Sequence, residues 1–544
     1  MKIISGKGVS SGIATGRIWC YIPHKSIISS LPIIDTEYEI ERLKQACTIV
    51  LLQLQGLEEK VRNDIGDEAA QLFSAHQLML MDEDFQQEIQ EAINIKHANA
   101  AYAVKQAGEL FSGLFSKMDD PYFKARATDV RDIAERIITA LEGNSRQESQ
   151  QPAGMVILYA DDLTPSETVL LDREHITAIV TRLGSVNSHS SILARAMGIP
   201  AIAGLELTEF STNWDGLEAI VDGDTGHLYL SPDLSTNQSY KHKMLLRYQA
   251  KQEMLKQRDT PAITMCGQHV ELYANIGSLT EVAAAIENGA EGIGLFRSEF
   301  LYLGRSDLPQ EEEQFSVYRS VAEGMKGKRV IIRTLDLGAD KQTDALSLDK
   351  EDNPALGCRA IRLCLARPEL LVVQLRAILR ASIYGRIAIM FPMITSVWEI
   401  NALKIIYKQC QEQLEKEGIA YRTDLEIGIM IETPAAAIIS DLLASEVDFF
   451  SIGTNDLTQY TLAADRQNPL IEPYSDPTHP ALLRLIKLVC NNAHRQKIWV
   501  GICGELAADL TITKYLLQLG IDELSVSPPS LLPLKKTIQH LNLT

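Results

Sequence analysis

Eight short apolar segments recur between helical segments in the C-terminal half of this chain, and this repeat constrains the fold more than any other feature. The segments are rich in Val, Ile, Leu and Phe, as the buried strands of parallel sheets are. In chain order they read VELYANI, GIGLFR, VIIRTLD, IAIMFPM, IGIMIE, DFFSIG, IWVGIC and LSVS. Eight strands that alternate with helices predict a (β/α)₈ barrel over residues 261–544.

Polar and charged residues directly follow these predicted strands. Barrels of this kind place their chemistry at the C-terminal ends of the strands, whereas a merely solvated surface would spread its ionic residues over the helices. In strand order the residues are Gly277, Arg297, Glu299, Arg333, Asp336, Met393, Glu432, Asn455, Asp456, Cys503, Glu505 and Ser527. We therefore expect a functional site at this end of the barrel.

The residue types at these strand ends indicate a small anionic ligand and a divalent metal. Glu432 and Asp456 follow neighbouring strands, and two carboxylates completed by water and ligand oxygens are a normal way to hold Mg²⁺. Two surface acids that cap helices would give the same pattern. The arginines favour the metal site, because guanidinium groups bind phosphate and carboxylate through paired hydrogen bonds. These arginines are Arg297, Arg333, Arg359 and Arg466.

Two further residues complete the expected site. Asn455 adds a neutral donor for a phosphate oxygen. Cys503 ends the seventh predicted strand, where a thiol could deliver a proton to an enolate carbon. A buried core cysteine is the alternative interpretation of Cys503.

The N-terminal half has a different organisation. Residues 36–141 are rich in Glu, Gln, Lys, Ala and Leu at helical spacing, with almost no Pro or Gly, which predicts a helical subdomain. Strand-like segments flank it on both sides, at residues 13–21 before it and at 155–160, 176–182 and 219–232 after it. We therefore expect helices inserted into a compact α/β unit. A charged, Gly-free stretch at 237–258 predicts a connecting helix.

His189 is the residue of this half that most invites a chemical interpretation. It lies where the apolar run ITAIVTR and the turn at Gly184 lead into the helical stretch SILARAM. A helix N-terminus there would stabilise a phosphoryl group on the imidazole, and Asn187, Ser188 and the following serines offer hydrogen bonds to the ring. A buried histidine or a plain helix cap is the alternative. If His189 accepts phosphate from the barrel site, a domain movement must bring the two together.

Composition and charge narrow the class of partner. The formal net charge is −19, from 71 acidic and 52 basic residues, which argues against nucleic acid and anionic membranes and is compatible with a basic protein partner. The N-terminus lacks the apolar core of a signal peptide, and no stretch reaches the ~20 apolar residues of a membrane span. Eight scattered cysteines without a CxxC pair indicate neither a disulfide framework nor a zinc site. We expect a cytoplasmic protein.

The motifs of the whole chain carry a resemblance to a known family, Enzyme I of the phosphoenolpyruvate-dependent sugar phosphotransferase system. They span nearly the whole chain in family order. The matching motifs are SHSSILAR, DLTPSET, NGAEGIGLFRSEFL, RTLDLGADK, NPALGCRAIR, IMFPM, ETPAA, DFFSIGTNDLTQYTLAADR and GICGELA.

The resemblance implies a reaction and a role for each matched residue. It implies that His189 is the phosphohistidine, that Cys503 protonates the enolate to give pyruvate, and that Glu432 and Asp456 hold Mg²⁺. It implies that phosphoenolpyruvate is bound by Arg297, Arg333, Arg359, Asn455 and Arg466. It further implies that the helical insert docks the small carrier protein HPr, which takes the phosphoryl group from His189, and that the chain forms a homodimer through the barrel.

The resemblance, together with the predicted elements, gives a domain plan. We expect an α/β phosphohistidine domain of residues 1–23 and 145–233, an inserted helical carrier-binding subdomain of residues 24–144, a linker helix at 234–260, and the phosphoenolpyruvate-binding barrel at 261–544. The acidic segment at 64–84 suits a basic carrier surface, although an amphipathic helix pair needs no partner.

Two departures accompany this interpretation, and several competing interpretations stand beside it. Asn187 stands where the sugar branch usually has threonine, and asparagine is closer to the nitrogen-regulatory branch, yet no sensory domain precedes Met1 as that branch would have. The chain also ends at Thr544, earlier than is typical.

Pyruvate phosphate dikinase and phosphoenolpyruvate synthase share the histidine and barrel domains but need an ATP-binding domain, for which no residues remain. A non-catalytic phosphocarrier that keeps the fold and a barrel lyase that cleaves carbon–carbon bonds are also compatible with parts of the pattern.

Overall fold

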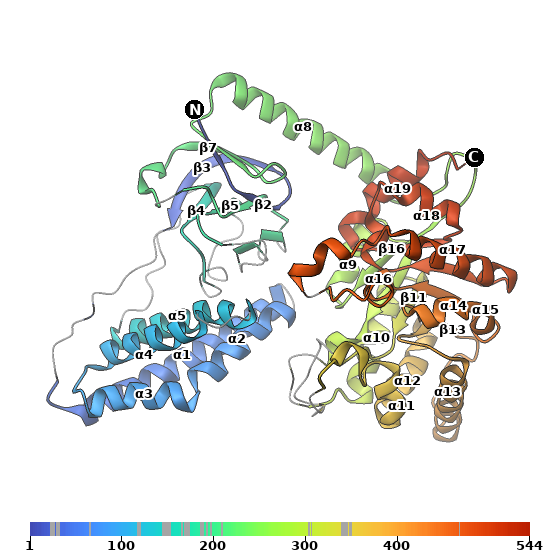
Figure 1. Ribbon diagram of the computed structural model, residues 1–544, viewed down its shortest axis with the longest axis horizontal. Coiled ribbons are helices and arrows are strands. Elements are labelled where there is room, and N and C mark those ends of the chain that lie inside the picture. Colours follow the sequence, from blue (N-terminus) through green and yellow to red (C-terminus); the bar gives the residue numbers. More distant parts are fainter. Residues whose placement is uncertain are drawn as a thin grey trace. The chain divides into compact units, whose positions relative to one another are not determined.

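The computed structural model describes the chain as two compact units, residues Met1–Gln249 and Ala250–Thr544. Figure 1 traces both units along the sequence. The described residues are 1–21, 28, 33–64, 67–116, 121–143, 154–164, 167, 175–184, 190–191, 194–195, 198–207, 210–302, 305, 307–338, 346, 351–466 and 468–543. Side chains are described for these residues except those at 59–64, 67–72, 116, 121–125, 251, 469, 470 and 472.

The first unit is built on a mixed sheet of eight described strands. Its strands are β1 Lys2–Ser5, β2 Lys7–Ser10, β3 Ile13–Tyr21, β4 Val156–Ala160, β5 Ile176–Thr181, β6 Ala201–Ala203, β7 Glu218–Asp222 and β8 His227–Leu230. Their order in the sheet is β1-β8-β7-β3-β4-β5-β6-β2. The four central strands β3 to β6 run parallel, and the remaining pairs are antiparallel. The parallel centre explains why β4, VILYA, is buried at every residue.

The helical part of this unit is an insertion between two neighbouring strands. The chain leaves the sheet at the end of β3 and returns in β4, which pairs with β3 in parallel. Between them lie α1 Thr36–Asp64, α2 Asp67–Leu80, α3 Glu83–Asn94, α4 Ala100–Ser116 and α5 Pro121–Leu141. These helices have a hydrophobic core of their own, drawn from residues 43–141. The predicted helical insertion is therefore confirmed.

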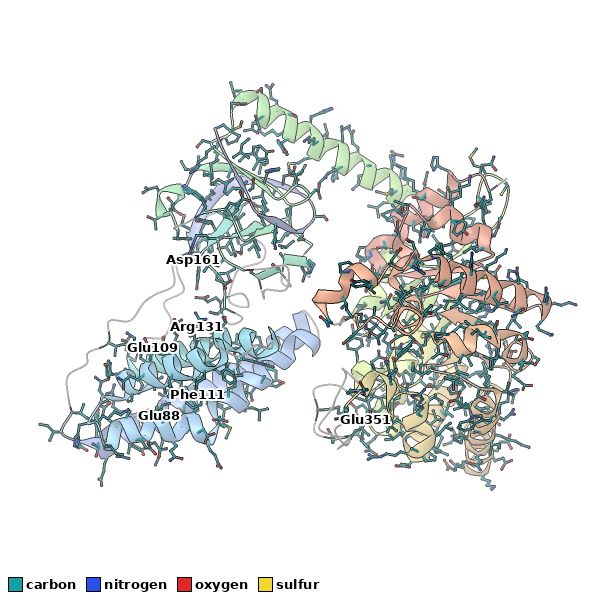
Figure 2. All side chains as sticks on the ribbon, viewed as in Figure 1. Glu88, Glu109, Phe111, Arg131, Asp161 and Glu351 are labelled. Carbon is teal, nitrogen blue, oxygen red and sulfur yellow. The ribbon has the colours of Figure 1, made fainter. Side chains whose placement is uncertain are left out.

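Packing inside the helical part depends on close helix contact. Phe111, labelled in Figure 2, packs edge-to-face on Phe85 with ring centroids 5.6 Å apart. Helices α4 and α5 meet at Gly108, where a Cβ atom would lie 2.7 Å from the Cβ of Ala134. A larger residue at 108 would push the two helices apart.

The predicted connecting helix is also present. Helix α8, Leu234–Lys256, is continuous in Figure 1 and crosses the boundary between the two units. It begins after Asp233, whose carboxylate accepts hydrogen bonds from Ser235 Oγ and the Thr236 N–H.

The second unit is a closed barrel of eight parallel strands, as the repeat predicts. The strands are β9 Glu271–Ile276, β10 Gly292–Arg297, β11 Arg329–Arg333, β12 Arg386–Phe391, β13 Glu426–Ile431, β14 Phe449–Ile452, β15 Trp499–Ile502 and β16 Glu523–Val526. Each pairs with the next, and β16 closes on β9. All eight predicted strands are thus confirmed.

Helices surround this barrel and share one large hydrophobic core with the outward faces of its strands. They are α9 Glu281–Glu287, α10 Glu311–Gly324, α11 Ile361–Ala366, α12 Pro368–Ala381, α13 Val397–Glu417, α14 Pro434–Ile438, α15 Ser440–Leu443, α16 Thr454–Leu462, α17 Pro480–Arg495, α18 Thr513–Leu519 and α19 Leu531–Gln539. Among the described residues, no helix is long and apolar enough to cross a bilayer. All eight cysteines carry free thiols.

Candidate active site

The structure brings most of the predicted site residues together at the C-terminal ends of the barrel strands. Arg297 and Arg333 are the last residues of β10 and β11, and Glu432 and Cys503 directly follow β13 and β15. Asn455 and Asp456 lie in the first turn of α16, which follows β14. Arg359 lies before α11 and Arg466 after α16.

Asp336 links two of the predicted arginines. Its two carboxylate oxygens lie 3.1 Å from Arg333 Nη1 and 2.8 Å from Arg359 Nη2. Glu299 forms a further ion pair with Arg333. Burial by itself would lower the pKa of Arg333, but Glu299 and Asp336 raise it by more, so the guanidinium stays charged although it is buried.

Asp456 links a second pair of arginines. Its carboxylate oxygens lie 3.5 Å from Arg359 Nη1 and 3.7 Å from Arg466 Nη1. Arg359 is 2 % exposed and also donates to Tyr460 Oη at 3.3 Å. These contacts hold the forked ends of the arginines in one place, which is what binding of a phosphate or carboxylate requires.

Backbone geometry that is unusual for a side-chain-bearing residue accompanies both parts of this site. Ala360, beside Arg359, has φ = 50° and ψ = −123°, a conformation that glycine tolerates far better. Met393, after β12, has φ = 57°. The Met393 N–H donates to Glu432 Oε1 at 2.5 Å, so the left-handed residue aims a main-chain donor at this carboxylate.

Glu432 is fully buried, and its second oxygen, Oε2, has no hydrogen-bond partner within the described parts of the chain. Burial and the neighbouring carboxylates Asp456 and Asp336 raise the pKa of Glu432 to about 8. A buried carboxylate oxygen without a donor is costly unless a proton or a cation satisfies it. The site is therefore prepared for a positive charge at this oxygen.

A magnesium ion fits this donor set. Mg²⁺ needs only one or two protein carboxylates and takes its other ligands from water and substrate phosphates. Glu432 Oε2 and Asp456 supply such a pair. The described residues contain no group of three or more His, Cys, Asp or Glu side chains arranged to hold a metal, so the fit depends on this pair of carboxylates with water and substrate oxygens.

Asn455 and Glu505 hold each other across two strand ends. Asn455 Nδ2 donates to Glu505 Oε1 at 3.2 Å, and the Glu505 N–H donates to Asn455 Oδ1 at 3.1 Å. The pair fixes the first turn of α16, after β14, to the 3-10 turn that follows β15. Asn455 is thereby oriented at the same end of the barrel as the arginines.

Cys503 belongs to the interior of the barrel and is 7 % exposed. Its main-chain carbonyl accepts a hydrogen bond from Asn275 Nδ2 at 3.0 Å, and its Sγ lies 3.7 Å from the carbonyl oxygen of Ile452. Burial raises the pKa of the thiol to about 12, so it carries its proton at neutral pH. A protonated thiol in a dry place is a suitable acid for a carbanion-like carbon.

Arg297 differs from the other arginines in its surroundings. Its guanidinium stacks over the Phe300 ring at 4.8 Å from the centroid, and its buried Nε has no hydrogen-bond partner among the residues described. A guanidinium held by an aromatic face keeps its donors available for a ligand.

The predicted phosphohistidine lies outside the described residues, together with Asn187 and Ser188. The structure describes the residues around it. Gly184, at the predicted turn after β5, has φ = 98°, and Ser190 and Ser191 are buried and helical. The predicted strand is confirmed and the positive φ of Gly184 agrees with the predicted turn, whereas the start of the helix lies outside the described residues.

Sequence reasoning missed some of the residues that shape this site. Tyr460 binds Arg359 and donates to the Ala355 carbonyl at 2.5 Å, and its only signal in the sequence is its place one helical turn after Asp456. Asp336 and Met393 were among the predicted strand-end residues, but neither the bridging role of Asp336 nor the main-chain donor at Met393 has a sequence signal.

Family models match three parts of the chain. Residues 251–543 match the family described as PEP-utilising enzyme, PEP-binding domain, residues 5–126 match PEP-utilising enzyme, N-terminal, and residues 153–226 match PEP-utilising enzyme, mobile domain. Among solved structures, a solution structure of Enzyme I covers 45% of this chain and 99% of its own at 30% identity and a TM-score of 0.39.

Curated relatives cover almost the whole chain. The phosphoenolpyruvate-protein phosphotransferase of Bacillus subtilis is 42% identical and covers 100% of this chain and 95% of its own. Those of Priestia megaterium and Staphylococcus carnosus are 42% and 40% identical, each covering 99% of this chain and 94% of its own. On this identity and coverage, the chain is an enzyme that belongs to the phosphoenolpyruvate-protein phosphotransferase family, the Enzyme I family that its motifs resemble.

Proposed function

We propose that this enzyme transfers the phosphoryl group of phosphoenolpyruvate to its own His189, releases pyruvate, and passes the phosphoryl group to a histidine of the carrier protein HPr. The observation that supports this best is the cluster at the barrel strand ends, where three arginines pair with the carboxylates of Asp336 and Asp456 and a buried oxygen of Glu432 has no donor among the described residues. A trianionic substrate with a divalent metal matches those charges.

In this proposal the arginines bind and orient the substrate. Arg297, Arg333, Arg359 and Arg466 neutralise its phosphate and carboxylate, and Asn455 adds a neutral hydrogen bond to phosphate. Glu432 and Asp456 hold Mg²⁺, which supplies positive charge for the transferring phosphoryl group. Cys503 then donates its proton to the methylene carbon of the enolate that remains, which forms pyruvate.

The proposal extends to the domain plan and the partners. We assign residues 1–23 and 145–233 to the phosphohistidine domain, 24–144 to the carrier-binding subdomain, 234–260 to the linker and 261–544 to the barrel. Acidic residues such as Glu88 and Glu109 (Figure 2) suit a basic carrier. We also propose a cytoplasmic homodimer formed through the barrel.

One assay tests the central step. Full-length protein, Mg²⁺ and ³²P-labelled phosphoenolpyruvate should give an acid-labile, base-stable phosphoprotein together with pyruvate. His189→Ala should give no label, while His242→Ala, an exposed histidine of α8, should label like the parent. Equal labelling of both variants would contradict the assignment, and pyruvate release without any labelling would favour a lyase.

A nitrogen-branch carrier is the second candidate acceptor, because Asn187 is closer to that branch. Titrating labelled protein with HPr and with an HPr-like regulatory carrier separates the two. The preferred carrier should remove the label at the lower concentration.

A further inference from the structure

The interior of the barrel has a polar group of side chains that the proposed reaction leaves without a task. One side of the interior is apolar and includes Leu295, Ile331, Ala388, Met390 and Met430. The neighbouring strands β14, β15, β16 and β9 add Tyr273, Phe449 and Trp499 to this interior. They also carry, or lead directly to, a polar group made of Ser451, Cys503, Glu523, Ser525 and the partly buried Asn275. Barrel interiors are normally filled by bulky branched side chains, so this polar group calls for a reason.

The strand register places two of these residues, Ser451 and Glu523, in one row with Gly501 and Glu271. Ser451 of β14 pairs with Gly501 of β15, Gly501 pairs with Glu523 of β16, and Glu523 pairs with Glu271 of β9. Adjacent strands lie about 4.8 Å apart, so each residue in the row neighbours the next. The row leads from a buried serine to Glu271, whose side chain is 39% exposed.

Two glycines make room for the Glu523 carboxyl group within this row. A Cβ atom on Gly501 would lie 1.9 Å from Glu523 Oε2, and one on Gly294 would lie 2.6 Å from Glu523 Oε1. The Glu523 side chain therefore reaches over Gly501, toward the strand that carries Ser451. Any larger residue at either glycine would displace it.

Glu523 itself is a buried acid without a described structural task. It is 1 % exposed, and its Oε1 has no hydrogen-bond partner among the described residues. Arg329 is near, but its ion pairs go to Glu271 at 3.2 Å and Glu426 at 3.0 Å. Burial, with the charge of Glu271, raises the pKa of Glu523 well above its ordinary value, so the carboxyl group holds a proton.

Cys503 directly follows β15, two residues after Gly501, and Ser451 is near its thiol. Ser451 acts on the thiol and lowers its pKa, against the larger effect of burial. This contact is looser than a full hydrogen bond, because Ser451 Oγ meets hydrogen-bond geometry with no described residue. Its hydroxyl is therefore free to exchange partners. Ser451 is thus a neighbour of Gly501, over which the Glu523 carboxyl group lies, and it also acts on the Cys503 thiol.

We propose that Glu523 returns a proton to Cys503 after each turnover, by way of the Ser451 hydroxyl. The proposal rests on the proposed role of Cys503 as proton donor and adds how that thiol is recharged. Once Cys503 has protonated the enolate it is a thiolate in a buried place, with its proton now in the methyl group of pyruvate. Before each further turnover, a proton from solvent must therefore reach this buried thiolate.

The proton transfers balance without any electron transfer. The S–H bond of Cys503 breaks as the C–H bond of pyruvate forms. The Ser451 O–H then protonates the thiolate while its oxygen takes the proton of Glu523, which leaves Glu523 as a carboxylate. Glu523 regains a proton from water at the opposite end of the barrel, where its neighbour Glu271 is partly exposed and accepts a hydrogen bond from Tyr273.

The experiment separates the first turnover from later ones. Rapid-quench measurements use full-length protein with Mg²⁺, phosphoenolpyruvate and excess HPr, and count pyruvate per active site. Glu523→Gln keeps the shape of the neutral acid but cannot give up a proton in this way. It should form its first pyruvate at the parent rate, because Cys503 begins protonated, and then turn over about 10- to 100-fold more slowly.

Further readouts and a matched control distinguish a relay from a packing effect. Steady-state turnover of Glu523→Gln should show a larger solvent deuterium isotope effect than the parent. Ser451→Ala should reproduce the burst, and Ser451→Thr, which keeps a hydroxyl, should restore later turnovers. Glu426→Gln, at the same end of the barrel and bound to the same Arg329, should behave like the parent in both phases.

Two results would overturn the relay. Parent-like steady-state turnover in both Glu523→Gln and Ser451→Ala would remove the need for it, and equal slowing of the first and later turnovers would assign Glu523 a purely structural role. Cys503→Ala separates this from the proposed function. If Cys503→Ala releases pyruvate at the parent rate, the proton donor itself is wrong. If it does not, and Glu523→Gln is parent-like, only the relay fails.

Discussion

At the scale of single residues, the site depends on which charges are matched and which are not. Arg333 and Arg359 each have carboxylate partners, whereas one oxygen of Glu432 has no described donor. The cysteines differ from one another in a second way, since some thiols are exposed and others are buried. These differences lead to two predictions about titration and reactivity.

The first prediction concerns Glu432 in the metal-free enzyme. Its pKa is raised to about 8 by burial, Asp456 and Asp336, against about 4.3 in an unfolded chain. Between about pH 4 and pH 8, the folded state therefore holds a proton on Glu432 that the unfolded state has lost. The contribution of Glu432 to the free energy of unfolding is complete below about pH 4 and falls as the pH rises toward 8. Urea unfolding of the parent should show this decline.

The matched comparison isolates the Glu432 contribution. Glu432→Gln should be less sensitive to pH than the parent between about pH 5 and 8. Glu412→Gln, an exposed acid of α13, should keep the parent slope. Saturating Mg²⁺ should stabilise the parent most at the upper end of this range, because metal binding needs the ionised carboxylate. A Glu432→Gln slope equal to that of the parent would refute the prediction.

The second prediction ranks the thiols by reactivity. Cys266 is exposed, and its hydrogen bond with Thr264 lowers the pKa of the thiol, while burial raises the pKa of Cys503 to about 12. Iodoacetamide at pH 8 should therefore modify Cys266 first and Cys503 at least about 100-fold more slowly, because only the thiolate reacts. Peptide mass spectrometry over time gives both rates. Comparable rates at the two positions would show that the Cys503 thiol is accessible and ionised.

At the scale of elements, the barrel strands could be predicted because each is a short apolar run, and most of these runs lead into polar or charged residues. Strands β1 and β2 were missed, since they have four residues each and only Gly6 between them. The stretch at 219–232 is a β7–β8 hairpin rather than one strand, and its turn contains Gly226 at φ = 72°. Short strands at a sheet edge depend on their partners more than on local pattern.

The same distinction applies to the candidate site. Residues at strand ends could be assigned from the sequence, because parallel strands in a barrel bring those ends together. The partners of each residue could not, because Asp336 between two arginines and the Met393 N–H on Glu432 follow from backbone path rather than residue type. His189 remains a prediction, since it lies outside the described residues.

A third prediction concerns the start of α13, which depends on a buried acid. Glu399 Oε2 accepts hydrogen bonds from the N–H groups of Thr395 at 2.6 Å and Ser396 at 2.8 Å. Glu399→Ala should lower the free energy of unfolding by about 2–4 kcal/mol, because it leaves two main-chain donors unpaired. Glu412→Ala, on an exposed turn of the same helix, should change it by less than about 0.5 kcal/mol. Urea denaturation compares the two, and equal effects would contradict the capping role.

At the scale of the whole molecule, the chain combines two units joined through one helix and carries a net charge of −19. The buried arginine cluster of the barrel is an exception within this acidic protein. Charges at the surface act on a partner over long range, whereas the buried charges of the site act on a ligand at short range. Salt should weaken the surface interactions more than the buried ones.

The fourth prediction uses that difference. Raising ionic strength from about 50 to 500 mM should increase the KM for the carrier several-fold, because surface attraction is screened over about 10 Å at 0.1 M. The KM for phosphoenolpyruvate should change less, since buried ion pairs are screened less. Asp84→Asn should raise the KM for the carrier, as salt does, whereas Glu412→Gln should leave this KM unchanged. Equal sensitivity of both KM values would argue against electrostatic docking on the helical part.

The left-handed Met393 has a consequence for how this site tolerates change. Its main-chain N–H fixes one oxygen of Glu432, and every amino acid except proline offers the same group. A substitution at position 393 can change the conformational strain of this residue, but the hydrogen bond from its main-chain N–H to Glu432 is kept. The direction in which Glu432 presents its other oxygen is thus secured by the polypeptide itself, independently of the side chain chosen at that position.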